Sequence, residues 1–248
     1  MNENIPHYLG ADVEIRDDIK ASHREMLTYL VSPGPWFSGA ERRSIALESR
    51  NAASCALCSE RKESLSPEHP AGEHTRVSDL PEPLVEMAHR IRRDPQRLSR
   101  PWFEKMLASG LSEGQYAEAV GVVTFTAGLD YFCLALGIYP FEFPQARAGE
   151  PSGYRPDGLR EGIAWLSILA PEDAAGPEEN LYEEAEFVPN IARALSQIPD
   201  HVRCLQDESR SHYLAISELG DPMIGRDLDR LQMELVASRV SALNECFY

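Results

Sequence analysis

Apolar residues recur at helical spacing along most of the chain, and runs that alternate between apolar and polar residues are nearly absent. Helices are predicted over residues 12–30, 38–53, 84–93, 101–107 and 112–137, near 189–197 and 199–219, and from 227 to the end. We therefore predict an all-α fold.

Capping residues support two of these helix starts. Ser38-Gly-Ala-Glu41 matches a capping box, in which the serine hydroxyl and the glutamate carboxylate satisfy opposite unpaired amides. Ser112 is a suitable N-cap for the long apolar helix, and Gly137 is a suitable stop. Residues 64–83 are rich in proline and are expected to form a loop.

Composition and charge narrow the class of protein. The chain has 248 residues, of which 43% are hydrophobic and 26% are charged, as in ordinary globular proteins. A formal charge of −16 argues against binding nucleic acid or an anionic membrane. We expect no bilayer-spanning segment and no signal peptide. Five cysteines with a single close pair do not resemble a secreted disulfide framework, so we expect a cytoplasmic protein.

Cys55-Ala-Leu-Cys58 is the sharpest candidate for chemistry. Two cysteines three residues apart on a helix lie on one face and can form a disulfide or bind a metal. Ser54 is expected to cap this helix and to place Cys55 in its first turn, where unpaired amides stabilise a thiolate. Cys55 and Cys58 are therefore predicted to act as nucleophile and resolving thiol. The alternative is that both are small buried residues.

The same thiols also suit zinc. Cys55-x2-Cys58-x10-His69-x4-His74 supplies two thiolates and two imidazoles, a ligand set typical of tetrahedral zinc. This zinc-stabilised structural module is the third hypothesis for the protein. No organic cofactor is expected, because no glycine-rich phosphate loop follows a strand.

Three further residues are candidates for a proton relay or a pocket. Glu48 precedes the thiols by about two helical turns, Lys62 follows them, and Asp130 interrupts an apolar helix. A solvated charged face is the alternative for Glu48, and a polar partner is the alternative for Asp130.

The chain resembles the alkylhydroperoxidase D and carboxymuconolactone decarboxylase-like family. The resemblance is carried by Trp36-Phe-Ser-Gly-Ala-Glu41-Arg42 with the cysteine pair, and by Gly110-Leu-Ser-Glu-Gly-Gln-Tyr-Ala-Glu118. Leu181-Tyr-Glu-Glu-Ala and Met233-Glu234-Leu-Val-Ala-Ser-Arg resemble a second such unit. The resemblance implies a helical bundle with a partial second repeat, a homo-oligomer, and reduction of a hydroperoxide or disulfide substrate.

The active pattern of that family is Glu-x11-Cys-x2-Cys-x3-His. In the first unit Arg43 and Lys62 occupy the two positions that should move protons. In the second unit Glu234 and Cys246 match the relay glutamate and the first thiol, and they are carried over as catalytic candidates. The chain ends at Tyr248, one residue before the second thiol. A UGA codon read as selenocysteine, truncation and degeneration are the alternatives for that end.

These observations predict an alkylhydroperoxidase-like helical domain over residues 1–140, a linker over 141–160 and a partial second unit over 161–248. The predicted function is a thiol peroxidase or disulfide oxidoreductase. The main alternative is a non-catalytic helical interaction or assembly protein that has lost the proton relay.

Overall fold

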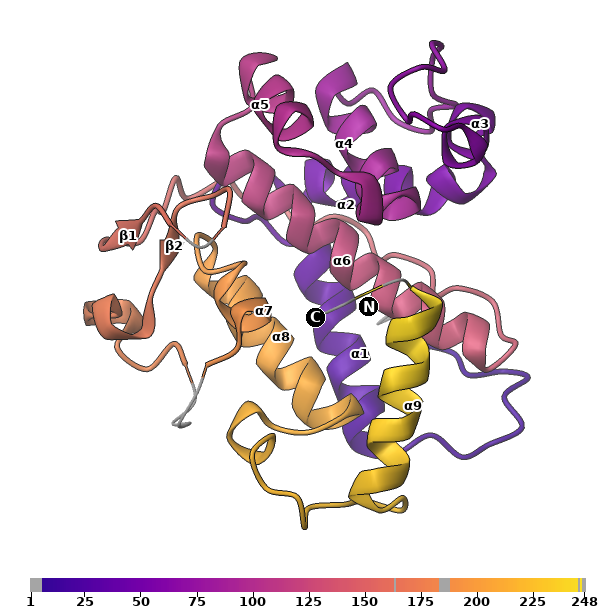
Figure 1. The fold of residues 1–248 in the computed structure, drawn as a ribbon, viewed down its shortest axis with the longest axis vertical. Helices are drawn as coiled ribbons and strands as arrows, with labels where there is room; N and C mark the ends of the chain where they lie inside the picture. The colour runs from indigo at the N-terminus through magenta and orange to yellow at the C-terminus, as the bar shows by residue number, and fades with distance from the viewer. Residues whose placement is uncertain (1–5, 163, 183–187, 245, 247–248) are drawn as a thin grey trace.

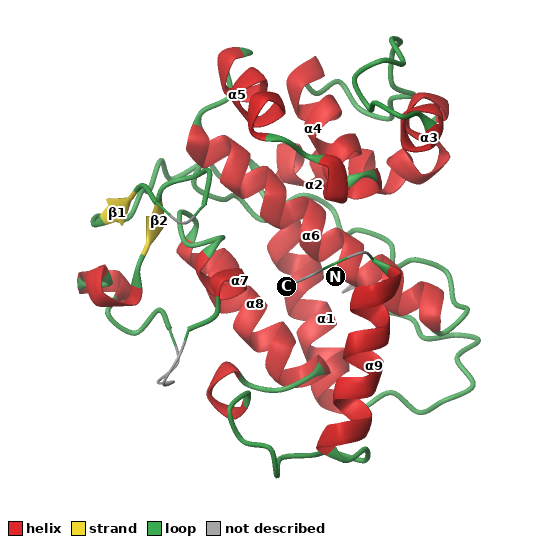
Figure 2. Ribbon diagram, in the orientation of Figure 1, coloured by secondary structure: helices red, strands yellow, loops and turns green. Residues whose placement is uncertain are grey.

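Helices form most of the molecule. The computed structural model describes residues 6–162, 164–182, 188–244 and 246. The helices are α1 (Asp17–Leu30), α2 (Gly39–Asn51), α3 (Ala56–Glu63), α4 (Glu82–Arg93), α5 (Arg100–Ala108), α6 (Glu113–Ala135), α7 (Asn190–Arg193), α8 (Pro199–His212) and α9 (Arg230–Leu243). Within these described ranges, the strands are limited to β1 (Leu159–Arg160) and β2 (Ile168–Leu169), which pair antiparallel (Figure 2). The predicted all-α class is confirmed.

The long helix α6 runs through the middle of the fold. Helices α2 to α5 lie on one side of it, and α1, α8 and α9 lie on the other (Figure 1). The main apolar core is built from α1, α2, α4, α5 and α6 and also includes Leu195 and Ile198 from the C-terminal part of the chain. Burying this many apolar side chains is the main source of stability for a helical fold.

Helix α6 corrects one expectation about the sequence. By length and composition this 23-residue helix could cross a membrane, although no bilayer-spanning segment was expected. In the fold, however, 61% of the apolar segment that meets this criterion is buried inside the protein. The core helix of a soluble protein passes the same test of length and composition.

The predicted capping box at Ser38 and the predicted N-cap at Ser112 are both present, and Ser112 also forms a capping box with Gln115. Ser38 Oγ accepts the amide of Glu41, and Ser112 Oγ accepts the amide of Gln115. Gly137 follows the end of α6 with a φ of +67°, a conformation that a side chain would strain. The other ends differ by several residues, since α1 begins at Asp17, α8 ends at His212 and α9 begins at Arg230. The start of α1 has no side-chain cap, whereas α9 begins at a capping box of Asp229 and Gln232 that the prediction missed.

Two glycines on one face of α6 let α8 approach closely. A Cβ atom at Gly121 would lie 2.2 Å from Nε2 of His201, and one at Gly128 would lie 2.9 Å from Oε1 of Glu208. His201 donates from Nε2 to the carbonyl of Glu118 at 3.1 Å and accepts at Nδ1 from the Tyr29 hydroxyl at 2.5 Å. These contacts attach the C-terminal part of the chain to the central helix.

The segment 141–160, predicted as a linker, contacts the turn between α1 and α2. The amide of Arg147 donates to the carbonyl of Val31 at 2.8 Å, and the amide of Gly153 donates to the carbonyl of Pro35 at 2.8 Å. No regular element forms within it before β1. The division of the chain into two related units stays a prediction.

Glu208 gives a prediction about stability and pH. Burial raises the pKa of its carboxyl to about 7, above the ordinary value of 4.5. Between pH values of about 4.5 and 7 the folded state binds more protons at this carboxyl than the unfolded state does. The free energy of unfolding therefore falls as pH rises through this range. Glu208→Gln should therefore stabilise the protein at pH 8 by on the order of 2 kcal/mol, and much less at pH 4. Urea unfolding at both pH values measures this, and an equal effect at both would contradict it.

Candidate functional site

The cysteine pair lies at the junction of α2 and α3. A single 3-10 turn, η1 (Ala52–Ser54), links the two helices. Cys55 itself is the N-cap of α3, and Cys58 lies in the first turn. The expectation that Ser54 caps this helix is wrong, because the Ser54 hydroxyl donates back to the carbonyl of Asn51 at 3.0 Å. Both cysteines are buried, with exposed fractions of 0% and 3%.

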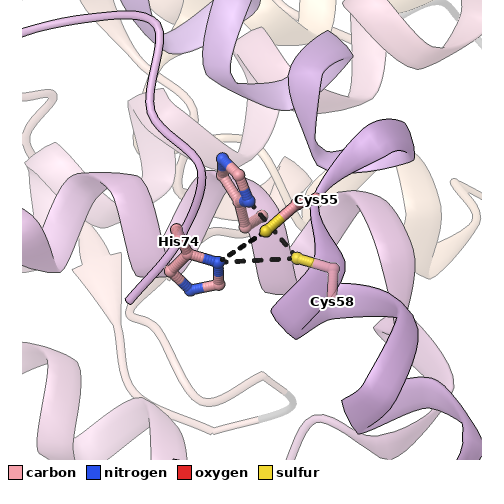
Figure 3. Close-up of side chains that lie close together, drawn as sticks. Cys55, Cys58 and His74 are labelled. Atoms are coloured by element: carbon pink, nitrogen blue, oxygen red, sulfur yellow. Dashed lines mark hydrogen bonds between the residues drawn. The ribbon is translucent and has the colours of Figure 1, made fainter. Parts of the chain in front are cut away.

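Two histidines complete a compact group with the thiols. Nδ1 of His74 lies 3.5 Å from Sγ of Cys55 and 3.5 Å from Sγ of Cys58. Nδ1 of His89 lies 3.3 Å from Sγ of Cys58. One donor atom from each of the four residues falls within 4.8 Å of all the others. Figure 3 shows the two sulfurs and the His74 ring turned toward one another.

Three parts of the fold bring these side chains together. The cysteines come from the start of α3, His89 from the buried face of α4, and His74 from the loop between the two helices. Side chains anchor that loop: Asn51 Nδ2 donates to the carbonyl of Thr75 at 2.5 Å, and Arg61 Nε donates to the carbonyl of Pro70 at 3.3 Å. The loop therefore covers the thiols and carries one of the four donors.

A carboxylate fixes the far side of the His74 ring. Nε2 of His74 lies 2.8 Å from Oε2 of Glu86 on α4. The same carboxylate accepts Nη1 of Arg61 at 2.7 Å and Nε1 of Trp102 at 3.2 Å. Burial raises the pKa of Glu86, but His74 and Arg61 outweigh that effect and lower it to about 2. Glu86 is thus ionised and accepts the Nε2–H of His74, so that Nδ1 faces the two sulfurs.

His89 is held in the same way. Its Nε2 lies 3.1 Å from Oε2 of Glu48, and both residues are fully buried. Oε1 of Glu48 accepts the Ser78 hydroxyl at 2.6 Å and the amide of Val77 at 3.0 Å. Burial raises the pKa of Glu48, but its hydrogen bonds to Ser78 and His89 outweigh that effect and lower it. Glu48 was predicted to serve a relay or pocket, and it lies directly behind this histidine.

The two thiols have opposite acidities. Burial raises the pKa of Cys55, but the backbone amide of Cys58 and the ring of His74 outweigh it and lower the pKa to about 6. Burial and the neighbouring Cys55 raise the pKa of Cys58 to about 12. The first thiol is therefore a thiolate at neutral pH, and the second keeps its proton while no cation is bound.

The distances within the group fit tetrahedral zinc. With Zn–S bonds of about 2.3 Å and Zn–N bonds of about 2.0 Å, a tetrahedron separates sulfur from nitrogen by about 3.5 Å. Three of the four sulfur–nitrogen distances in the group are 3.5, 3.5 and 3.3 Å. The donor set and these distances fit the metal.

The zinc ligand set inferred from the sequence changes by one residue. His69 is exposed and does not belong to the group, whereas His89 does. Residues 64–70 turn away from the thiols, because the amide of His69 bonds back to the carbonyl of Ser66 and the carbonyl of Pro70 to Arg61. The spacing is therefore Cys55-x2-Cys58-x15-His74-x14-His89.

The remaining candidates lie outside the group. Lys62 is exposed at the end of α3. Asp130 is buried and pairs with Arg50 at 2.7 Å and with Arg92 at 3.2 Å. It joins α6 to α2 and α4.

The candidates from the predicted second unit do not join the thiol pair. Glu234 on α9 bonds to the hydroxyl of Tyr213 and to Arg230, the latter at 2.7 Å. Cys246 is exposed beyond the end of α9, and its amide donates to the carbonyl of Ser241 at 2.9 Å. Neither residue is among the four donors, which come from residues 55–89.

Two residues of the site were missed in the sequence. His89 and Glu86 lie one turn apart on α4, where His89 follows the apolar residues Val85 and Ala88. A histidine on the apolar face of an amphipathic helix, with a carboxylate one turn away, was a usable signal.

Comparison with known proteins identifies no relative. No protein-family model, no curated protein and no solved structure matches this chain. The resemblance to the alkylhydroperoxidase D-like family accordingly stays a prediction that rests on the motifs alone.

Proposed function

We propose that this protein binds zinc in a closed site formed by Cys55, Cys58, His74 and His89. The metal would hold the start of α3, the 64–81 loop and α4 together. Its role is structural, because four protein ligands leave no coordination position for water or substrate. The burial of all four residues supports a closed site.

The observation that carries the proposal is that each histidine ring contacts a sulfur with one nitrogen and a carboxylate with the other. Nδ1 faces the sulfurs, while Nε2 is held by a carboxylate, Glu86 for one ring and Glu48 for the other. Histidines that bind metals commonly donate their second ring N–H to a carboxylate, which orients the ring and raises its basicity. Two such pairs meeting at two thiols are the arrangement expected for a metal centre.

Metal analysis of the purified protein tests the proposal. After refolding with zinc and dialysis, the wild type should retain one zinc ion per chain. Cys58→Ser and His89→Gln should retain far less, because each removes one of four ligands. His69→Gln and Cys246→Ser are matched controls, since they change a histidine of the same loop and an exposed thiol outside the group. A wild type without zinc, or a Cys58→Ser variant that keeps it, would overturn the proposal.

Thiol redox chemistry is the second candidate function. The supporting observation is the low pKa of Cys55, about 6, beside a Cys58 thiol whose pKa is about 12. His74 contributes, since burial lowers its pKa but Glu86 and Cys55 outweigh this and raise it. The His74–Glu86 pair could thus supply the proton transfer that Arg43 and Lys62 cannot.

In that chemistry the Cys55 thiolate would attack the terminal oxygen of a hydroperoxide. The O–O bond breaks, Cys55 becomes a sulfenic acid, and the departing alkoxide takes a proton from His74. Cys58 then attacks the Cys55 sulfur, so that a disulfide forms and water leaves with the Cys58 proton. An external dithiol reduces the disulfide. The burial of Cys55 makes this the weaker candidate, because a peroxide cannot reach it without opening of the loop.

Peroxide consumption by the metal-free protein with dithiothreitol separates the two candidates. A redox enzyme should lose at least about a hundredfold in rate in Cys55→Ser and little in Cys246→Ser. Equal rates for wild type and Cys55→Ser would exclude this second function.

A further inference from the structure

A second site of interest is a cavity of 1140 Å³ between α4, α6 and the C-terminal end of the described chain. It lies outside the metal group, and none of the four donors lines it. Its size is sufficient for a small organic molecule.

Among the described residues that line the cavity, the charged ones are basic. They are Lys62, Arg92, Arg93 and Arg97. In a chain with a formal charge of −16, four cations on one concave surface are unusual. The lining therefore favours an anion.

Two of these arginines have unused hydrogen-bond donors. Arg92 is 9% exposed, and its Nη2 pairs with Asp130, while its Nη1 is buried without a partner. Asp130 is shared, since it also pairs with Arg50 at 2.7 Å. The side chain of Arg93 forms no hydrogen bond or ion pair with any residue in the described ranges, and its Nε is buried without a partner. Buried N–H donors are costly unless an acceptor meets them.

Arg97 and Lys62 are expected to contribute less to binding an anion. Arg97 is already neutralised by Asp94 at 2.8 Å and donates to the carbonyls of Arg61 and Ser64. Lys62 is exposed at the edge. The donors available to a ligand are thus those of Arg92 and Arg93.

Part of the lining of the cavity is apolar. Val123 and Ala127 of α6 line it together with Ile91 of α4. The ring of Tyr131 lies 5.0 Å from the Arg92 guanidinium carbon and joins the apolar wall to the basic end. A ligand that matches both ends carries one anionic group and an apolar body.

We propose that this cavity binds an organic carboxylate, with its two oxygens on Arg92 and Arg93 and its apolar body against α6. Arg92 and Arg93 both line the cavity, and charge-assisted hydrogen bonds from guanidinium groups to a carboxylate are the strong ones. The apolar wall disfavours a purely hydrophilic anion such as inorganic phosphate. The proposal does not depend on the metal site.

Calorimetric titration of the full, zinc-loaded chain tests this site. The probes are straight-chain carboxylates from butyrate to dodecanoate, with acetate, inorganic phosphate and 1-octanol as controls. At least one longer carboxylate should bind at least tenfold more tightly than each control. Arg93→Gln should weaken that binding about tenfold, because it removes one charge-assisted hydrogen bond.

Two further variants make the result decisive. Ala127→Phe should weaken binding by filling the apolar end, which leaves the arginines unchanged. Arg100→Gln is the matched control, because this exposed arginine on α5 pairs with Glu104 away from the cavity. The proposal is overturned if no carboxylate in the series saturates, if 1-octanol binds as tightly, or if Arg93→Gln and Arg100→Gln behave alike.

Discussion

Removal of zinc with EDTA is expected to lower the midpoint of thermal unfolding by about 8–16 °C. A ligand that binds only the folded state stabilises it by about 4 kcal/mol when its free concentration is a thousand times its Kd. For a chain of this size, each kcal/mol corresponds to about 2–4 °C. The loss follows from the fold, because the 64–81 loop contains no helix or strand and carries His74.

Matched variants show whether the shift arises at this site. Differential scanning calorimetry of His69→Gln should give the same shift with EDTA as the wild type. Cys58→Ser should have a low midpoint already and should not respond to EDTA. EDTA that is already saturated with zinc should have no effect on any variant. A wild-type shift that persists in Cys58→Ser would place the stabilising metal elsewhere.

The second large effect concerns the buried ion pair between α2 and α6. Nε of Arg42 lies 3.7 Å from Oε1 of Glu118, and their side chains are 1% and 0% exposed. Arg42 also stacks over the Tyr29 ring at 4.1 Å, and Glu118 accepts the amide of Trp36 at 2.7 Å. Glu118→Ala should lower the free energy of unfolding by about 3–5 kcal/mol, because it leaves a buried guanidinium without its counter-charge.

The measurement is urea unfolding at about pH 8.5, where the carboxyl is ionised. Burial raises the pKa of Glu118 to about 7, although Arg42 opposes the shift. Glu104→Ala is the control: its pair with Arg100 is exposed, with side chains 62% and 65% exposed, and should change stability by less than about 1 kcal/mol. The double variant Arg42→Met with Glu118→Ala should lose less than the sum of the losses in Arg42→Met and Glu118→Ala alone. Additive losses would argue against a direct interaction.

Local signals in the sequence identified the helices well. The capping residues Ser38 and Ser112 act within three residues of the helix starts that they define, so the sequence around each is sufficient. Helix ends without such signals, as at Asp17 and His212, depend on packing against distant parts of the chain. Those ends differed from the prediction by several residues.

Only part of the candidate site could be predicted from the sequence. Cys55 and Cys58 are neighbours in sequence, and their spacing alone predicts that they share one face. The choice of His74 and His89 depends on the path of the loop and on which face of α4 is buried. Glu48 was a candidate from its position before the thiols, but its pairing with His89 and that of Glu86 with His74 join separate parts of the fold. Single-sequence patterns do not encode such long-range pairings.

The loop that carries His74 also determines how quickly a bound metal could leave. His74 is 5% exposed and Cys58 is 3% exposed, so a chelator cannot reach the centre while the loop is closed. The loop is held by a few side-chain bonds, including those from Asn51 and Glu48. Exchange of the proposed metal would therefore be governed by local opening, and its rate should level off as chelator concentration rises. Asn51→Ala should raise that limiting rate and leave the stoichiometry of zinc unchanged.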